Sequence, residues 1–400
     1  MDTETRIYRI LSNLSAVPVE ENGVDDRLRE DLGLATTEPD AGSDLTALRT
    51  TIRAEGDGLA VSGSKIFVTN GGYARLFTVS GRSPGLGGAR RGQSVVLLEK
   101  GDRGLEVGAE EDKLGLRASS TTALSLEDVR VPGDRLLGPP GAGAELLRHI
   151  LSWGRTVMAA GCCGTADAAF QKARAHCASR VQFARPLIQL GVVREQLADM
   201  AATLFAARAL VVWASGDEER LEVRSLSAKV LASEGAGDVC DLALQLHGGY
   251  GYIEETGLAL IVRDARITRI FEGANDVLRI HRGLFAAAGE TFVTGPDDTV
   301  PTPLRARLAA LTAEVAGEVT VARDRLGLKL GGDHPTLHRL GSLAMLRDSA
   351  EAAILRAEVE GGAGPALAAR WLDIVRARVA GLGARDVSRA STDTCLEATP

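Results

Sequence analysis

The sequence predicts an α+β protein that is mostly helical, with an antiparallel β-sandwich or barrel domain, a four-helix bundle and an extra C-terminal helical domain. Three observations support this fold class. Short β-branched runs separated by glycine-rich turns fill about residues 34–138. From about residue 143 apolar residues recur at helical spacing. Further Ala-, Arg- and Leu-rich helical stretches follow a segment rich in proline and aspartate near residue 300.

The composition is that of a globular chain. Its 400 residues are 45% hydrophobic and 25% charged, and a chain of this length holds about two to four domains. A net charge of −7 and an aromatic content of 4% argue against a nucleic-acid partner, which needs basic and stacking surfaces. Five cysteines without a Cys-x-x-Cys pair argue against disulfides and zinc, and no signal peptide is apparent. We therefore expect a cytoplasmic protein.

The expected domain boundaries follow changes of composition along the chain. They are 1–33 for a short N-terminal remnant, 34–138 for the β-domain, 139–292 for the helical bundle, 293–303 for a linker and 304–400 for the additional helical domain. The clearest strands are Ser64–Thr69 and Ser94–Leu98. Val131-Pro132-Gly133 and the glycine–proline run at 138–141 end the strand-rich region.

Long helical stretches follow. In the bundle we expect helices over a stretch beginning near Gly143 and over Val192–Trp213, Leu221–Leu246 and Asn275–Ala288. In the additional domain we expect helices over Leu304–Leu326, Pro335–Glu358 and Gly364–Leu382. The longer stretches exceed an average helix, as antiparallel bundles require. The apolar run Met200–Ser215 is too short to span a bilayer and contains Arg208.

Two glycine-containing segments are candidates for ligand binding. Thr37–Asp44 is a turn of small and hydroxyl-bearing residues, in which Gly42 permits close approach of an anion and Ser43 can donate a hydrogen bond to it. An ordinary polar turn is the alternative. Gln245–Tyr252 ends a long helix at a glycine pair, which is typical either of a helix C-cap or of close approach by a cofactor.

The segment 263–276 contains a candidate general base. Glu272 follows the apolar pair Ile270-Phe271, and desolvation raises the pKa of a carboxyl toward the range that a base needs. Alternatively, Glu272 only precedes the helix from Asn275 and is favoured there by the helix dipole, and the spacing favours this reading. His334 and His338 have the spacing of metal ligands, but without an obvious third ligand we expect no metal site.

Taken in order along the chain, these segments resemble the acyl-CoA dehydrogenase family. In the β-domain the resemblance lies in Thr37–Asp44, Gly63–Gly71, Lys113–Ser119 and Val129–Pro132. In the helical part it lies in Arg180–Leu187, Gln196–Met200, His247–Gly251 and Arg263–Gly273. The resemblance covers about residues 34–290, and the helices after residue 300 make the chain most similar to the very-long-chain branch of the family.

The resemblance implies FAD-dependent dehydrogenation of a fatty acyl thioester to a trans-2-enoyl thioester. Glu272 would remove the α-proton while a hydride leaves Cβ for flavin N5, and Arg155 would lie near the CoA thioester arm. The residues implied for the FAD site are Leu34, Thr36, Thr37, Gly42, Ser43, Val68, Thr69, Arg180, Gln182, Phe183, Gln245, Gly249, Asn275 and Asp276. Five of these would reach the FAD of a neighbouring subunit: Arg180, Gln182, Phe183, Gln245 and Gly249.

The resemblance also implies partners. An electron-transfer flavoprotein would accept the electrons, and the protein would form a homodimer or higher oligomer. The family has a longer helical N-terminal domain before its Thr-Glu-Pro segment, and this domain forms one wall of the acyl pocket. A partner chain or an oligomer neighbour would supply that wall here. Two alternatives stay open: a non-catalytic or hetero-oligomeric subunit of the same fold, and an acyl-CoA oxidase. Arg305 and Arg307, among apolar residues, allow peripheral membrane contact, although packing over the bundle is the simpler interpretation.

Overall fold

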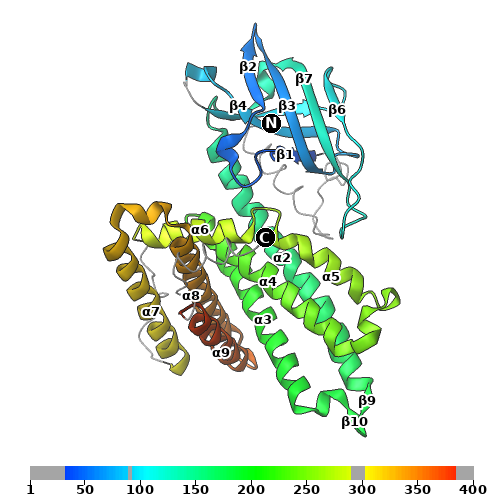
Figure 1. The fold of residues 1–400 in the computed structure, drawn as a ribbon, viewed down its shortest axis with the longest axis vertical. Coiled ribbons are helices and arrows are strands. Elements are labelled where there is room, and N and C mark those ends of the chain that lie inside the picture. The colour runs from blue at the N-terminus through cyan, green and yellow to red at the C-terminus, as the bar shows by residue number, and fades with distance from the viewer. Residues whose placement is uncertain (1–31, 89–91, 290–301, 384–400) are drawn as a thin grey trace, which may run out of the picture. The chain divides into compact units, whose positions relative to one another are not determined.

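The computed structural model describes residues 32–88, 92–289 and 302–383, and every structural statement below refers to these residues (Figure 1). Three expected segments lie wholly or partly outside these residues. Of the remnant 1–33 and of the linker 293–303 only the last two residues are described, and the expected 304–400 domain is described up to residue 383. The chain divides into two compact units. The first holds the described residues up to Gly161 together with Leu260–Ala274, and the second holds Cys162–Ala259 and the described residues from Asn275 onward.

An eight-stranded mixed sheet forms most of the first unit. Its strands are β1 (Leu32–Ala35), β2 (Thr51–Glu55), β3 (Gly58–Thr69), β4 (Leu76–Arg82), β5 (Gln93–Glu99), β6 (Leu105–Val107), β7 (Thr121–Pro132) and β8 (Leu136–Leu137). The order is β6-β7-β3-β2-β4-β5-β8. The expected β-domain is confirmed, but β1 pairs with β4 in parallel, as does Thr51 of β2 with Arg82. Alternation within one strand does not reveal the direction of its neighbour, so the sequence could not show this.

The core of this sheet consists of alternating apolar residues on its buried face. Ile52, Val61, Phe77 and Val79 are among those with no exposed surface. Burying an apolar side chain of this size stabilises the fold by about 1.5–3 kcal/mol. Leu147, near the start of helix α2 (Gly143–Ser179), packs against β5 and β8 and so fixes the first turns of that helix on the sheet.

Long helices dominate the second unit, which also takes α2 from Cys162 onward. They are α3 (Gly191–Ser215), α4 (Leu221–His247), α6 (Asn275–Ala287), α7 (Pro303–Leu326), α8 (His334–Glu360) and α9 (Gly364–Gly383). All were expected to within a few residues and are confirmed. Helix α5 (Leu258–Arg266) was not expected, because its nine residues are too few to establish a helical period.

Helix α8 is buried on nearly all sides. It packs against α3, α4, α6, α7 and α9, so the helices after residue 300 belong to the same compact unit as the bundle. On α7, Arg305 donates two 2.7 Å hydrogen bonds to Glu358, and Arg307 donates one of 2.7 Å to Asp373. These basic residues therefore take part in packing within the unit, which favours the packing interpretation over membrane contact.

Helix α3 is long and apolar enough to cross a bilayer by length and composition alone. However, 56% of its most apolar window is buried inside the structure. It packs against α4, α8 and α9. This is the environment of a core helix.

A buried ion pair connects three helices of the second unit. The Nε and one terminal nitrogen of Arg282 on α6 donate to Asp348 of α8 at 3.0 and 3.2 Å, and Ser227 of α4 donates to the same carboxylate at 2.6 Å. Burial of a charge is costly unless it is paired and hydrogen-bonded. The three helices are therefore held in one relative register by a single carboxylate.

Two glycines allow α6 and α8 to approach each other closely. A Cβ on Gly341 would lie 1.8 Å from the carbonyl oxygen of Arg279, and a Cβ on Gly283 would lie 2.0 Å from that of Leu337. Backbone blocks both positions, so no rotamer change can make room. The crossing of α6 and α8 requires glycine on both helices.

We therefore predict that Gly341→Ala lowers the free energy of unfolding by about 1–3 kcal/mol or more, because the two helices must separate. Urea unfolding followed by far-ultraviolet circular dichroism measures this change. Gly317→Ala on α7 is the matched control, because no described atom outside the adjacent backbone of its own helix lies within 4 Å of its added Cβ. That variant should gain about 0.5–1 kcal/mol. Equal stability of the Gly341→Ala and wild-type proteins would contradict the close crossing.

Candidate functional site

Main-chain carbonyls of the segment after β1 accept hydrogen bonds from two residues of β3. The carbonyl of Thr36 accepts a hydrogen bond from Lys65 Nζ at 3.0 Å, and the carbonyl of Thr37 accepts one from the Ile66 N–H at 2.9 Å. The hydroxyl oxygen of Thr36 is buried and has no hydrogen-bond partner among the described residues. A buried polar atom without a partner is uncommon in proteins and is consistent with a ligand that would supply one.

The end of β3 is irregular at the residues expected to flank a flavin. Pairing with β7 shifts register between Lys65 and Val68, and Phe67 inside this bulge has φ +57°. Asn70, just after the strand, has φ +62°. Left-handed backbone at non-glycine residues costs about 1–3 kcal/mol each and occurs preferentially at functional sites. The bulge leaves Val68 buried and Thr69 exposed. A Cβ on Gly33 of β1 would lie 3.2 Å from the Thr69 carbonyl oxygen, so the end of β3 lies beside β1.

The Gly42–Ser43 turn is open to solvent. The main chains of Glu38 and Ala41 exchange hydrogen bonds of 3.0 and 3.1 Å, which close the turn just before it. Gly42 and Ser43 are exposed, and among the described residues a Cβ on Gly42 would meet only a Thr37 methyl group, at 3.9 Å. The main chain here is accessible to an anion, as the sequence suggested.

Glu272 lies against helix α2 within the first unit. Its main chain has φ +54°, and its carbonyl accepts a hydrogen bond from Arg155 Nε at 3.2 Å. A Cβ on Gly154 would lie 2.9 Å from the Glu272 Oε2 atom. The neighbouring Trp153 has a buried indole N–H with no partner among the described residues. The structure therefore brings Glu272 together with Arg155, the residue expected near the thioester arm, in a partly buried setting.

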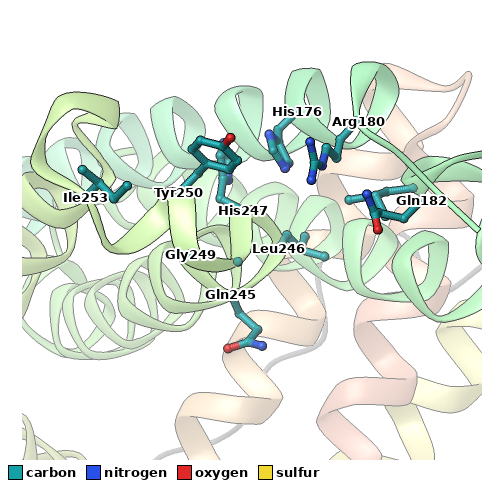
Figure 2. A pocket seen from close by; sticks show the side chains of 11 residues that line it. His176, Arg180, Gln182, Gln245, Leu246, His247, Gly249, Tyr250 and Ile253 are labelled. Atoms are coloured by element: carbon teal, nitrogen blue, oxygen red, sulfur yellow. The ribbon is translucent and has the colours of Figure 1, made fainter.

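A second group of expected residues lines a pocket in the second unit (Figure 2). The pocket has a volume of about 490 Å³. Its lining residues are His176, Arg180, Gln182, Leu187, Gln245, Leu246, His247, Gly248, Gly249, Tyr250 and Ile253. Four residues that the resemblance implied thus line one pocket: Arg180, Gln182, Gln245 and Gly249. Phe183, in the turn between β9 (Val181–Gln182) and β10 (Arg185–Pro186), is highly exposed and has φ +52°.

Two histidines stack on one side of this pocket (Figure 2). The ring centroids of His176 and His247 lie 4.2 Å apart with an interplanar angle of 23°, and His247 Nδ1 lies 2.8 Å from the Ala243 carbonyl. Burial lowers the pKa of His176, and charges at His247 and Arg180 lower it further. In Figure 2 the Gln245 side chain extends away from the histidine pair.

Asn275 and Asp276 take different positions at the start of α6. The Asn275 side chain is buried: its oxygen accepts a hydrogen bond from Lys229 at 2.8 Å, and its amide donates to Ser233 and Glu234 at 3.1 and 3.2 Å. Asp276 is exposed and lies 3.2 Å from His338 Nε2. The amide of Asn275 is thus engaged within the helical unit, whereas the carboxylate of Asp276 faces outward.

Sequence reasoning did not single out three residues that shape these sites. Gly154 gives space to the Glu272 carboxylate, and Glu38 and Lys65 form a buried ion pair beside the Thr36–Thr37 segment. The signal for the pair was present, since a lysine in an otherwise apolar strand needs a partner. The contact between Gly154 and Glu272 had no such signal in the sequence. The two residues are far apart along the chain: Glu272 lies 117 positions after Arg155, the residue next to Gly154.

Comparison with known proteins matches both parts of the chain to described domains. Residues 33–129 match the middle domain of acyl-CoA dehydrogenases, and residues 141–284 match the C-terminal domain. The human very long-chain specific acyl-CoA dehydrogenase, a mitochondrial protein, is 33% identical over 323 residues. That match covers 77% of this chain and 49% of the relative, so the chain spans about half of the relative's length.

Two solved structures share the fold. An acyl-CoA dehydrogenase complexed with FAD from Bacillus anthracis has a TM-score of 0.76 at 25% identity and covers 91% of this chain and 71% of its own. Butyryl-CoA dehydrogenase from Megasphaera elsdenii has a TM-score of 0.62 at 33% identity and covers 70% of this chain and 77% of its own. A β-domain followed by long helices, with matching domains in this order, defines the class. The chain belongs to the acyl-CoA dehydrogenase family.

The His176 environment predicts how stability depends on pH. Because the folded pKa of His176 lies below its ordinary value of 6.5, the unfolded chain takes up this proton first as pH falls. Stability should therefore decrease as pH is lowered from 6.5 toward the folded pKa of this residue, and His176→Gln should reduce that decrease. Urea unfolding at a series of pH values between about 5 and 7.5 measures the slope.

The control is His149→Gln, which removes an exposed histidine of α2 and should keep the wild-type slope. An unchanged slope in His176→Gln would show that the stacked pair does not influence this part of the pH profile.

Proposed function

We propose that the protein is an FAD-dependent acyl-CoA dehydrogenase that converts a fatty acyl thioester to a trans-2-enoyl thioester, with Glu272 as the general base. The main support is the position of Glu272 within the first unit. Its carboxylate lies beside Gly154 and its carbonyl is bound by Arg155. The helix-dipole interpretation of Glu272 does not require either contact, whereas a base must be held in place beside its substrate.

The residues of the first unit fit a flavin dinucleotide. The buried Thr36 hydroxyl lacks a partner among the described residues, the β3 bulge lies just before Val68 and Thr69, and Gly42 and Ser43 are exposed. We assign Leu34, Thr36 and Thr37 to the lining of the flavin, with Thr37 bonding the ring edge, and the Gly42–Ser43 turn to the pyrophosphate. A planar ring and a diphosphate need these two kinds of contact, a rigid wall with directed polar atoms and accessible backbone N–H groups.

In the second unit, the pocket lined by Arg180, Gln182, Gln245 and Gly249 is proposed to hold part of the FAD of a neighbouring subunit, with Phe183 at its exposed edge. Arginine, amide groups and a glycine pair suit a phosphate or a nucleotide. We keep Asp276 as the α6 residue near the adenosine half. For Asn275 we propose contact through its main chain, since its side chain is bound to α4.

In the proposed chemistry the thioester loses two hydrogens, one from Cα as a proton and one from Cβ as a hydride, and each goes to a different acceptor. Glu272 takes the proton from Cα of the thioester, and bound FAD supplies the acceptor for the hydride that leaves Cβ. The left-handed conformation of Glu272 sets the direction of its main-chain N–H, which we assign to the thioester carbonyl, where negative charge develops. Arg155 holds the Glu272 main chain and so orients both groups.

The visible absorption spectrum of the purified 400-residue protein tests the function first. We expect a bound flavin whose absorbance bleaches when a fatty acyl-CoA is added. A colourless protein that takes up no FAD would instead indicate the non-catalytic or hetero-oligomeric subunit. Peroxide release under air, with little electron transfer to an electron-transfer flavoprotein, would indicate the acyl-CoA oxidase. Oligomeric state, a chain that completes the site, and the cytoplasmic location remain predictions.

Replacing the proposed base gives the sharpest test of the site. Glu272→Gln should keep its FAD but lower the rate of bleaching by acyl-CoA by about 10²–10⁴-fold, because an amide does not accept the α-proton. Stopped-flow absorbance measures this rate. A variant that bleaches at the wild-type rate would show that another group is the base.

Gly154→Ala tests the space beside the base. The new methyl group would lie 2.9 Å from Glu272 Oε2, and this flexible carboxylate must move while the fold stays intact. Misplacement of a reacting group by a fraction of an ångström to one ångström lowers rates by about tenfold to a hundredfold. We expect a loss of this size in the bleaching rate without a loss of stability toward urea.

The control is Gly164→Ala on the same helix, where the added Cβ has no neighbour within 4 Å in the part of the chain that the structure describes, apart from the adjacent backbone of its own helix. It should bleach as the wild type does. Equal rates in Gly154→Ala and Gly164→Ala would contradict the proposed position of the carboxylate.

A further inference from the structure

Lys65 is a buried cation in the centre of β3. Its side chain has 0% exposed surface, and that of Glu38 has 4%. Lys65 Nζ donates a 2.8 Å hydrogen bond to Glu38 Oε1. The core of the sheet is mainly apolar, with uncharged hydroxyl groups such as those of Thr50 and Thr78 also buried, so the two charges have been removed from water almost completely.

The pair connects three backbone segments: the one that holds Thr36 and Glu38, the one at Arg49 and Thr50, and strand β3 at Lys65. Besides Glu38, the ammonium group of Lys65 binds the Thr36 carbonyl at 3.0 Å. The Glu38 carboxylate accepts hydrogen bonds from the main-chain N–H of Arg49 at 2.6 Å and of Thr50 at 3.1 Å. Lys65 also stands at the last regular position of β3 before the bulge that leads to Val68. Both backbone segments proposed to face the flavin ring are therefore held through this pair.

The hydrogen bonds account for the ionised state of Glu38. Burial by itself raises the pKa of this carboxyl, but the bonds from Lys65, Thr50 and Arg49 outweigh it and lower the pKa below its usual value. Burial also lowers the pKa of Lys65, and Glu38 opposes that shift. Each group thus keeps the other in its charged form.

Stability alone does not account for these two charges. A well-packed apolar pair of similar volume is often as stable as a buried ion pair, because both ions lose their hydration. What an apolar pair cannot supply is directed hydrogen bonding to the Thr36 carbonyl and to the Arg49 and Thr50 N–H groups. Only the charged pair can therefore hold these backbone atoms in position through hydrogen bonds.

We propose that Glu38 and Lys65 are positioning residues for the flavin, which set the Thr36–Thr37 segment and the β3 bulge at the spacing that the isoalloxazine ring requires. This inference rests on the proposed function. Neither residue is assigned a contact with FAD, and both act through the backbone that they hold. The pair is a requirement for cofactor affinity rather than for folding.

The test is the double variant Glu38→Gln/Lys65→Met in the full 400-residue chain. It removes both charges at nearly constant volume, so the apo protein should still fold and unfold in one cooperative urea transition, with a loss of stability that the control below allows for. FAD titration of the apo protein should then give a dissociation constant at least tenfold higher than that of the wild type. The visible band of the bound flavin should also shift toward that of free FAD, a change that mere loss of stability does not produce.

Arg135→Met is the matched control. It breaks an ion pair of the same unit, between Arg135 and Asp102 at 2.7 Å, which is also partly shielded from solvent and touches none of the proposed flavin segments. This variant should lose stability but keep its FAD affinity and spectrum.

Three results would overturn the inference, and they are distinguishable. Wild-type protein that binds no FAD removes the proposed function itself. A double variant with wild-type affinity and spectrum removes only the positioning role. An affinity loss that Arg135→Met shares, in proportion to its loss of stability, shows that the pair serves stability alone.

Discussion

The structure depends on one constraint, that a charge removed from water must be held by a partner inside the protein. Buried ions are expensive, so each one fixes the elements that solvate it. In the first unit Lys65 and Glu38 connect the exit of β1 to β3. In the second unit the carboxylate of Asp348 is shared by Arg282 of α6 and Ser227 of α4. Apolar packing surrounds these groups but is not directional, and they determine how the elements are aligned.

The same logic extends to the proposed chemistry. A general base is useful only if its carboxylate stays where the substrate proton will be, and here main-chain geometry supplies that restraint. Glu272 adopts a left-handed conformation, is bound through its carbonyl by Arg155, and is bordered by a glycine. Left-handed backbone at Glu272 and at the β3 bulge therefore lies where we propose that the base and the cofactor meet the substrate, and it also occurs at Leu116, Asp128, Phe183 and Ala184.

Most of the fold could be predicted because long periodic segments bury one face regardless of their partners. The expected helices from Val192 onward agree with α3, α4 and α6 to α9 for this reason. Two features escaped prediction. Helix α5 is too short to show its period, and the parallel pairing of β1 with β4 depends on a strand distant in sequence. The family could also be predicted, because many short motifs, each ambiguous alone, occur in one specific order along the chain.

For the candidate site, the sequence by itself determined which residues belong to the family motifs, since side-chain chemistry and spacing are properties of the chain. Only the tertiary structure decided which way those residues face. It placed the Asn275 amide against α4, left Asp276 exposed, and put Gly154 beside Glu272. The physical reason is that orientation is set by contacts between distant segments, whose free energies depend on burial and geometry that no local pattern records.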